Sequence, residues 1–376
     1  MVIIFVALFG GVFFLLQRIL YAHFWNKGVQ VQLSFEKEMV QAGDEIKLFE
    51  VVENDKKLPL SSLKVKFQCS RHLIFSDREN GNVTDQYYRN DLFSIMPYHR
   101  VTRTHRILCP TRGYYGFHGI DLVGADLFFS QEMMDSRESD ASLYVIPPSL
   151  PIARLEPAIR RINGELAVRS HALKDPFTYR GIREYEPFDE MKQINWKATA
   201  KTDELKVNVR EHTAVSCVRI LMNLEDHGIL RREELLEMSI SICAGLAGEL
   251  LSQGVRVSIL ANAKDCLTRQ ELRIDEQTHI AGMDAIYKAL ARLDLDTPMK
   301  SFGECFQREL FEDKQPLFTI FLSPDRHSDY VNILKEYGIR TNGNFVWICP
   351  VKKSSEEKEE EGLEGRIVYM IVSNDL

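Results

Sequence analysis

The sequence has few cysteines, and no two of them are spaced as a CxxC pair. A tetrahedral zinc site needs clustered ligands, and a disulfide framework needs an even set of cysteines, so the pattern favours neither. An odd, dispersed set is typical of reduced thiols in a cytosolic environment, several of them buried as small apolar side chains. The seven cysteines are Cys69, Cys109, Cys217, Cys243, Cys266, Cys305 and Cys349.

The usual signatures of catalysis are missing as well. The chain has no glycine-rich phosphate loop, no G-x-S-x-G turn and no HExxH helix. His227, His279 and His327 stand singly, and neither Cys266 nor Cys305 has a histidine at a suggestive spacing. We therefore expect a binding protein with no cofactor, not an enzyme. An unrecognised hydrolase, with pKa-shifted residues gathered in a pocket, remains an alternative.

Positive charge is not in excess either. Lysine and arginine number 47 against 54 acidic residues, which gives a net charge of −7. Nucleic acid attracts a basic surface, so we expect no nucleic-acid partner. With 376 residues, 45% hydrophobic and 27% charged, the chain is long enough and apolar enough for two or three folded domains.

What the sequence does have is one long apolar run at its start, "MVIIFVALFGGVFFLLQRILYAHFW". Residues 1–25 can cross a bilayer if Arg18 reaches the headgroups, with Tyr21, Phe24 and Trp25 as an interfacial aromatic belt. Positive charges (Arg18 and Lys27) follow the run and none precedes it, which predicts a single-pass anchor with a cytoplasmic body. A cleaved secretory signal is the rival, but no basic start and no small-residue cleavage site is present.

Two folded regions follow. Residues 28–148 alternate apolar and polar side chains in short runs such as "VQVQLSF" and "EIKLFEVVEN", which predicts an antiparallel β-sandwich. Residues 215–376 alternate buried strands with amphipathic helices, which predicts a doubly wound α/β domain. Residues 149–214 form a connector that starts with the proline-rich "VIPPSLPI" and contains one short helix at about 154–165. The predicted class is therefore a multidomain α+β protein.

The connector contains the most specific motif of the chain, "GIREYEPFDEMKQINWKATAK". It resembles the signature of the domain of unknown function 58 family, which is membrane-associated and commonly encoded beside MoxR-type AAA+ ATPases. The chain departs from the family at Phe188, Lys192, Asn195 and Lys201, where the family has glycine, arginine, aspartate and arginine. The matching positions, with Lys201 kept as a candidate, are Gly181, Arg183, Tyr185, Asp189, Ile194, Trp196, Thr199, Ala200 and Lys201. Upstream, "RGYYGFHGIDLVGADLFF" resembles a second family pattern through Arg112, Gly113, Tyr115, Asp126 and Phe128.

The resemblance covers nearly the whole chain and implies a function. It implies a membrane-anchored scaffold or adaptor that works with a MoxR-type AAA+ ATPase in the assembly or maturation of other envelope proteins. It also implies that the α/β domain is similar to a von Willebrand factor A domain. Such domains often hold a divalent cation through Asp-x-Ser-x-Ser, and this motif is missing here, so no metal is expected. The weak candidates are Asn223, Glu225, Asp226 and Asp325. A metal-dependent adhesion module is a further alternative.

The central motif has two interpretations that remain open. Arg183, Asp189 and Trp196 would either lock the connector against both domains, with the tryptophan buried, or form a docking surface for a partner. Both roles are compatible with the residue types.

Overall fold

The structure is a computed structural model of the chain. It describes residues 2–77, 80–117, 119–172, 179–186, 191, 194–202, 204–210, 217–228, 231–312, 317–352 and 360–372. Contacts between Cα atoms divide the chain into two compact units. The first is Met1–Pro148 with Leu290–Arg292, and the second is Ser149–Ala289 with Leu293–Leu376.

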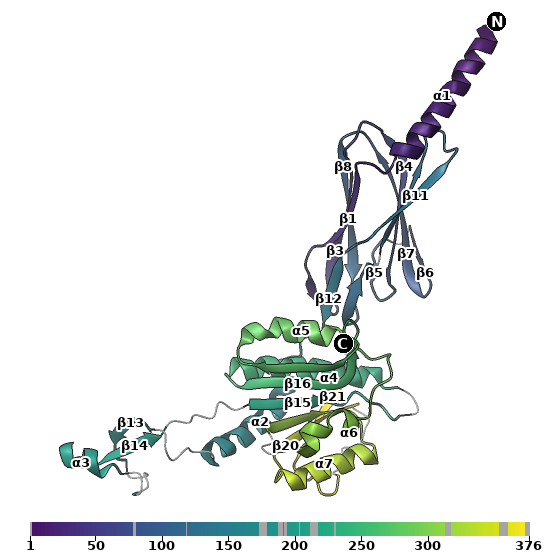
Figure 1. Cartoon of the computed structure of the whole chain (residues 1–376). Coiled ribbons are helices and arrows are strands. Elements are labelled where there is room, and N and C mark those ends of the chain that lie inside the picture. The colour runs from purple at the N-terminus through teal and green to yellow at the C-terminus, as the bar shows by residue number, and fades with distance from the viewer. Residues whose placement is uncertain are drawn as a thin grey trace. The chain divides into compact units, whose positions relative to one another are not determined.

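The first unit begins with the apolar helix α1 (Val2–Phe24), which leaves one end of a β-sandwich (Figure 1). Nearly all its large apolar side chains up to Leu16 are exposed, and the helix is long enough to span a membrane or to serve as a signal sequence. A second helix of sufficient length, α4 (Glu233–Ser252), is mostly buried and belongs to a core.

The last turns of α1 pack on the sandwich. Tyr21 and Trp25, four residues apart on one helix face, are buried, and the Trp25 ring lies directly over Gly124, where a Cβ would be 2.4 Å from it. The Tyr21 hydroxyl donates to the Pro59 carbonyl at 2.8 Å. The prediction that Tyr21 and Trp25 belong to an interfacial belt is therefore wrong, because the sandwich covers that face; Phe24 alone of the three is exposed.

The predicted β-sandwich is present, and its two main sheets pack their inner faces together. One sheet has the order β1-β3-β8-β5 and the other β11-β10-β4-β7-β6, with a small third sheet β2-β12-β9. The strands are β1 (Val29–Phe35), β2 (Met39–Gln41), β3 (Glu45–Asn54), β4 (Leu60–Ser70), β5 (Ile74–Phe75), β6 (Gly81–Val83), β7 (Gln86–Ile95), β8 (His99–Leu108), β9 (Gly113–Gly116), β10 (Ile120–Ala125), β11 (Glu132–Arg137) and β12 (Ser142–Ile146). Ile46, Leu48 and Val52 of β3 show the alternation, since each is buried and each following residue is less so.

The second unit is built on a mostly parallel sheet of order β17-β16-β15-β19-β20-β21, with β18 also paired to β16. β17 is an antiparallel edge strand, whereas β16, β15, β19, β20 and β21 run parallel. The strands are β15 (Cys217–Met222), β16 (Arg256–Asp265), β17 (Glu271–Gln277), β18 (Leu293–Asp294), β19 (Phe318–Leu322), β20 (Phe345–Lys352) and β21 (Ile367–Val372). The edge strand β17 was not anticipated from the sequence.

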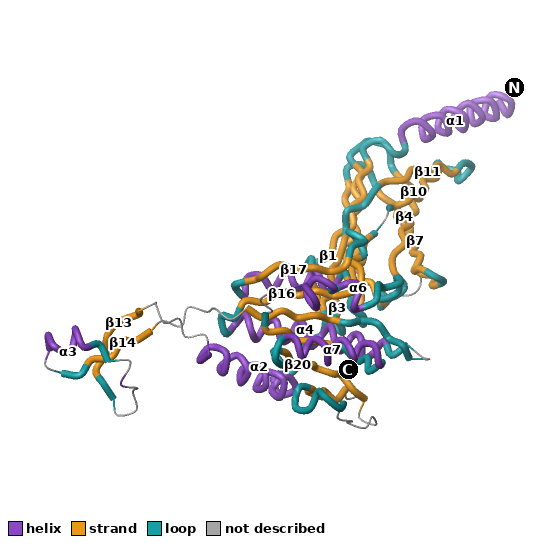
Figure 2. The backbone as a smooth tube through the Cα atoms, turned by 60° about the horizontal axis from the view of Figure 1, so that its bottom comes forward, coloured by secondary structure: helices purple, strands orange, loops and turns teal. Residues whose placement is uncertain are grey.

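Helices lie on both faces of this sheet (Figures 1 and 2). On one face, Gly245 of α4 lets Leu155 of α2 (Ile152–Ala172) approach so closely that a Cβ would be 2.6 Å from it. On the other face, α6 (Phe302–Cys305) and α7 (Ser328–Arg340) pack aromatic side chains against Phe321 and Trp347. Three further helical elements are η2 (Ile280–Gly282), α5 (Met283–Ala291) and the π-helix η3 (Arg308–Glu312).

The predicted connector is more structured than expected. Its helix α2 is longer than the predicted residues 154–165, and it packs on α4 within the second unit. The motif segment forms a small hairpin of β13 (Tyr179–Glu184) and β14 (Lys206–Arg210) with the short helix α3 (Trp196–Thr202) between them.

Candidate functional site

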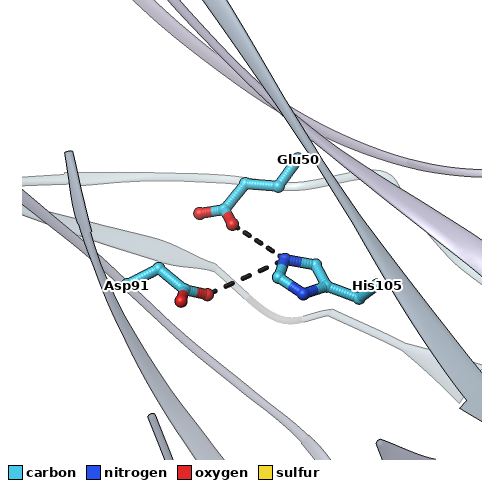
Figure 3. A group of neighbouring side chains, drawn as sticks. All are labelled: Glu50, Asp91 and His105. Atoms are coloured by element: carbon cyan, nitrogen blue, oxygen red, sulfur yellow. Dashed lines mark hydrogen bonds and ion pairs between the residues drawn. The ribbon is translucent and has the colours of Figure 1, made fainter. Parts of the chain in front are cut away.

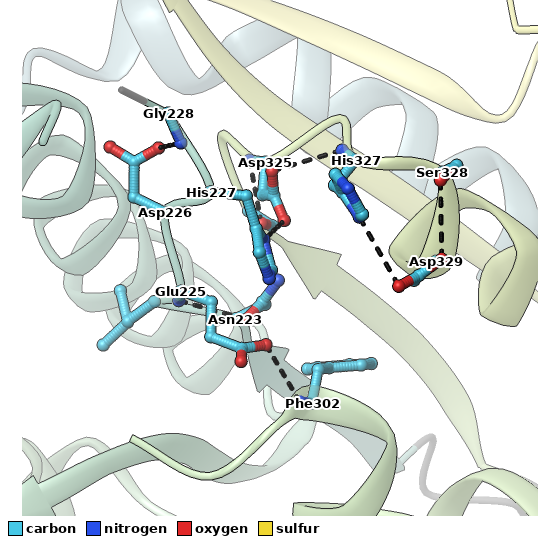
Figure 4. A network of polar contacts seen from close by, with 12 residues as sticks. Asn223, Glu225, Asp226, His227, Gly228, Phe302, Asp325, His327, Ser328 and Asp329 are labelled. Atoms are coloured by element: carbon cyan, nitrogen blue, oxygen red, sulfur yellow. Dashed lines mark hydrogen bonds and ion pairs between the residues drawn. The ribbon is translucent and has the colours of Figure 1, made fainter. Parts of the chain in front are cut away.

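The strand order of the α/β sheet reverses between β15 and β19, its two central strands. Both run in the same direction, so the loops that follow them, residues 223–228 and 323–327, meet at one edge of the sheet. Ligands of open α/β sheets usually bind at the carboxyl ends of strands at such a reversal. The weak cation candidates predicted from the sequence fall on these two loops (Figure 4).

Asn223 is fully buried at the end of β15, where its side chain joins the following loop to strand β16. Its Oδ1 accepts hydrogen bonds from the Glu225 amide at 3.1 Å and from Asn262 Nδ2 at 3.0 Å. Asn262 in turn accepts from the Leu224 amide at 2.9 Å. This oxygen is therefore used to hold the loop in place.

The two carboxylates that follow Asn223 point to different partners. Asp226 accepts from the backbone amide of Arg232 at 2.5 Å and from its guanidinium at 2.7 Å, just before α4 begins. Burial raises the pKa of Asp226, but the hydrogen bonds from Arg232 and Gly228 outweigh burial and lower it overall. Glu225 accepts from the Phe302 amide at 3.0 Å, and burial raises the pKa of its carboxyl.

Asp325, which follows β19, is paired with a histidine from the other loop. His227 Nδ1 lies 2.8 Å from Asp325 Oδ2, and the ring of His227 stacks on that of His327 at 4.6 Å. The hydrogen bond to Asp325 raises the pKa of His227. His327 precedes α7 and lies 3.7 Å from Asp329. The edge of the sheet thus carries two stacked histidines between buried and exposed carboxylates.

The four cation candidates therefore lie on two neighbouring loops, but each has a protein partner. Among the residues that the structure describes, three or more His, Cys, Asp or Glu ligand atoms lie within 4.8 Å of one another only at Glu50, Asp91 and His105. The oxygen cage that a hard cation needs is thus not formed by the predicted residues. What the sheet edge offers chemically is a histidine–aspartate pair, His227 with Asp325, that can exchange a proton, and an ion pair of Arg232 with Asp226.

Within the motif hairpin, three residues hold the fold together. Ile194 is buried and bridges to Val207 of β14. The Asn195 side chain accepts from the Ala198 amide at 3.0 Å, as an N-cap of α3, a role for which asparagine is well suited. The Thr199 hydroxyl accepts from the Lys206 amide at 3.0 Å and ties α3 to β14. These positions have a structural role.

Other motif residues face solvent. Trp196 is 63% exposed, so the prediction of a tryptophan buried as a lock is wrong; the small hairpin core is already filled by Ile194 and Val207. Ala200 and Lys201 are exposed, and Arg183 donates to the carbonyl of Glu184 at 2.8 Å. Gly181 lies at a bulge in β13, and the Tyr185 amide donates to Leu205. Asp189, with Phe188 and Lys192, lies outside the described residues.

The upstream motif forms a corner in the sandwich. The Tyr115 hydroxyl donates to the carbonyls of Thr111 at 3.0 Å and Arg112 at 3.3 Å, so the ring folds back over its own chain. A Cβ on Gly113 would lie 2.7 Å from that ring. The Arg-Gly-x-Tyr pattern therefore has a steric reason, since only glycine leaves room for the tyrosine.

A buried charged cluster inside the sandwich was not anticipated (Figure 3). His105 Nε2 lies 3.0 Å from Glu50 and 3.7 Å from Asp91, and all three side chains are almost fully buried. Asp91 accepts from Arg89 at 2.5 Å and from Arg103 at 2.7 Å. Burial raises the pKa of Glu50; it also raises that of Asp91, but hydrogen bonds from Arg89 and Asn80 lower the Asp91 pKa overall.

The signal for this cluster was in the strand alternation. Glu50 follows Ile46 and Leu48 at the same inward-facing spacing, and Arg89 and Asp91 occupy such positions in β7. These charged residues thus occupy the inward-facing positions of their strands. Because Arg89 and Arg103 already neutralise Asp91, the cluster is a closed ion-pair network.

Comparison with known proteins adds little. No protein-family model matches the chain, and no curated protein matches it either. Among solved structures, 33% of the chain is similar to 7% of the α2-macroglobulin of E. coli, at 18% identity and a TM-score of 0.22. A CARDB domain from Pyrococcus furiosus (14% identity, TM-score 0.19) and a cohesin from Archaeoglobus fulgidus (12%, 0.21) match over 30% and 31% of this chain and 91% of theirs. At these TM-scores the likenesses carry no argument about fold or function.

Proposed function

We propose that the protein is a membrane-anchored adaptor that works by binding and not by catalysis, with its body on the cytoplasmic side. α1 is the anchor, and Arg18 and Lys27 after it favour that orientation. All seven cysteines are free, as expected in a reducing compartment. The α/β domain is proposed to be von Willebrand A-like, which its antiparallel edge strand and central reversal support.

The single observation that carries the binding role is the exposure of Trp196. An exposed tryptophan leaves a large apolar surface in water, which is unfavourable, and Trp196 adds nothing to the hairpin core. Tryptophan is also prominent among the residues that dominate the affinity of protein interfaces. Ile182, Met191 and Leu205 of the same segment are also exposed. We refer to these four exposed side chains of the hairpin segment together as the Trp196 surface, and propose that Trp196 docks a protein partner with the others available beside it.

The proposed partner is a MoxR-type AAA+ ATPase, with other envelope proteins as clients. This choice rests on the resemblance of the motif segment to the domain of unknown function 58 family. The cluster at the sheet edge is compatible with a binding role, since its groups are engaged in ion pairs and hydrogen bonds that position loops.

The test is capture from native membranes with a non-hydrolysable ATP analogue that traps the ATPase. The parent chain is expected to recover an AAA+ ATPase, and W196A to recover at least about tenfold less, since a tryptophan at the centre of an interface commonly contributes 2 kcal/mol or more. I339A is the matched control, because Ile339 of α7 is also a large exposed apolar residue and lies outside the motif.

Two outcomes would contradict the proposal in different ways. Recovery of no AAA+ ATPase by any of the three chains would remove the proposed partner. Equal recovery by W196A and the parent chain would keep the partner but remove the Trp196 surface as its docking site.

A further inference from the structure

The turn between β10 and β11 carries three consecutive apolar side chains that face outward. Phe128 is 53% exposed and Phe129 66%, and Leu127 beside them is exposed too. Runs of exposed apolar residues are unusual on a surface that meets only water, and they mark sites of protein or membrane contact. We call residues 127–129 the apolar tip.

The tip is held firmly in this outward orientation. Asp126 is buried beneath it and accepts from the Ser130 amide and hydroxyl, both at 2.6 Å, and from the Gln131 amide at 3.2 Å. Phe129 has a φ of 54°, a left-handed conformation that is strained for a residue other than glycine. The hydrogen bonds to Asp126 and the left-handed backbone of Phe129 thus hold the two phenylalanines in an exposed position.

The tip also packs against α1. The Phe128 ring lies 5.7 Å from Phe14 and 6.3 Å from Phe13. One turn further along the helix, Gln17 donates to Asp126 at 2.8 Å and Arg18 donates to Gln131 at 2.9 Å. The two polar residues that interrupt the apolar run of α1 are therefore engaged by the base of the tip.

This contact fixes the depth of the tip relative to the helix. The exposed apolar surface of α1 continues past this contact, because Ile19 and Leu20 are exposed as well. If α1 crosses the bilayer as proposed, hydrocarbon that covers Ile19 and Leu20 also covers the level of Phe128, whose ring packs on Phe13 and Phe14. Phe128 then lies below the bilayer surface.

We infer that this end of the sandwich is a second membrane-contacting element, with Phe128 and Phe129 inserted into the lipid beside α1. The inference rests on the proposed role of α1 as an anchor and extends it. The aromatic side chains expected at the membrane interface are supplied by the sandwich, in place of Tyr21 and Trp25, which the sandwich buries.

A second turn at the same end has matching chemistry. Asn54, which pairs with Val29 at the start of β1, donates to the Met96 carbonyl, so the β7–β8 turn lies at the end where α1 leaves. In that turn Met96 and Tyr98 are exposed. Nearby, Lys27 and Lys57 are exposed in the α1–β1 and β3–β4 loops. Apolar and aromatic residues with lysines are the composition of a surface that rests on anionic lipid.

The consequence is that the sandwich is fixed to the bilayer at two places. A domain attached by one helix and a flexible link swings freely, whereas the contacts of Gln17, Tyr21 and Trp25 with the sandwich and the insertion of the tip restrict its orientation.

The test uses the full chain reconstituted in vesicles of phosphatidylcholine and phosphatidylglycerol. A photoreactive benzoyl-phenylalanine replaces one residue at a time, and mass spectrometry identifies lipid crosslinks. Phe9, exposed in the middle of α1, reports on the anchor. Phe128 and Phe129 report on the tip at two positions, so that one poorly tolerated substitution does not decide the outcome. Val83 is the matched control: it is 60% exposed and pairs with Tyr87 near the start of β7, at the opposite end of the sandwich from Met96.

The expected result is crosslinking to lipid acyl chains from positions 9, 128 and 129, at least about tenfold above position 83. Crosslinking from position 9 alone, with positions 128 and 129 at the level of position 83, would overturn the inference and leave the anchor standing. Failure at position 9 as well would overturn the anchor and, with it, this inference.

Discussion

Two clusters of acidic and histidine side chains in the described part of the chain differ in their access to water. In the sandwich, Glu50, Asp91 and His105 are almost fully buried and two arginines complete the network. At the edge of the α/β sheet, the side chain of His227 is 45% exposed while its partner Asp325 is buried. The same residue types therefore form a closed structural network in one place and a solvent-accessible, titratable site in the other, because burial decides which charges can exchange with water or a ligand.

The largest effect is expected in the closed network. D91A would remove the buried carboxylate that Arg89 and Arg103 share and leave the buried Arg89 with the half-exposed Asp77, and removing one partner of a buried pair typically costs about 3–5 kcal/mol. Since the chain has two units, unfolding should be followed locally, by hydrogen exchange of peptides from β3, β7 and β8 in the full chain. We expect their protection to fall by two orders of magnitude or more.

E132A is the matched control for D91A. Glu132 pairs with Lys64 at 2.8 Å in the same sandwich, but its side chain is 61% exposed, and exposed pairs contribute about 0–1 kcal/mol. Comparable loss of protection in both variants would mean that burial is not what distinguishes the sandwich cluster.

A smaller effect is expected from E50Q, and it should depend on pH. Burial raises the pKa of Glu50 in the folded state above its ordinary value of 4.5, so the folded protein binds the carboxyl proton more tightly than the unfolded chain. The protonated Glu50 therefore contributes its full stabilisation below pH 4.5, and this contribution is lost as the pH rises through the folded-state pKa. Glutamine carries no charge and removes this dependence. The free energy of unfolding of E50Q, relative to the parent, should therefore increase with pH above 4.5. Urea unfolding over a pH series, followed locally at peptides of the sandwich, measures it, and parallel pH profiles would contradict the assignment.

D325N tests the open cluster, with a smaller effect on stability. The hydrogen bond to Asp325 raises the pKa of His227, so the pair stabilises the fold fully below the ordinary histidine pKa of about 6.5, and this contribution is lost as the pH rises through the raised pKa. We expect D325N to lower the pKa of His227 towards 6.5, as measured by NMR titration. D329N is the control, since Asp329 is 83% exposed and contributes least to the shift. A His227 pKa unchanged by D325N would be evidence against the pairing.

Sequence patterns predicted the helices and strands better than they predicted which side chains contact one another across the fold. The stripe of Leu236, Ile240, Cys243, Ala247 and Leu250 in α4 is fully buried as its spacing indicated, because helical period and burial are local properties. The exposure of Trp196 could not be predicted this way, since it depends on whether Ile194 and Val207 already fill the hairpin core. Similarly, Tyr21 and Trp25 have the composition of a membrane belt, and only the three-dimensional contact with Gly124 assigns Trp25 to the sandwich.

The candidate residues at the sheet edge illustrate the same division. Their position at the ends of β15 and β19 followed from the strand pattern, because parallel strands end at the same edge. Their partners, such as Asn262 for Asn223 and Arg232 for Asp226, lie on other elements and could be found only from the fold.

The smallest effect is expected when divalent cations are added, because the carboxylates of both clusters already have protein partners. At the sheet edge, a cation would have to displace Arg232 from Asp226 and His227 from Asp325, and a hard cation prefers several free oxygen ligands. In the sandwich it would have to displace the buried Arg89 and the partly exposed Arg103 from Asp91. We therefore expect no heat of binding with Mg²⁺ or Mn²⁺ at millimolar concentration in a calorimetric titration of the full chain. Saturable binding that D325N abolishes and E132A retains would instead favour a metal-dependent adhesion module, and the adaptor proposal would then have to be abandoned for the α/β domain.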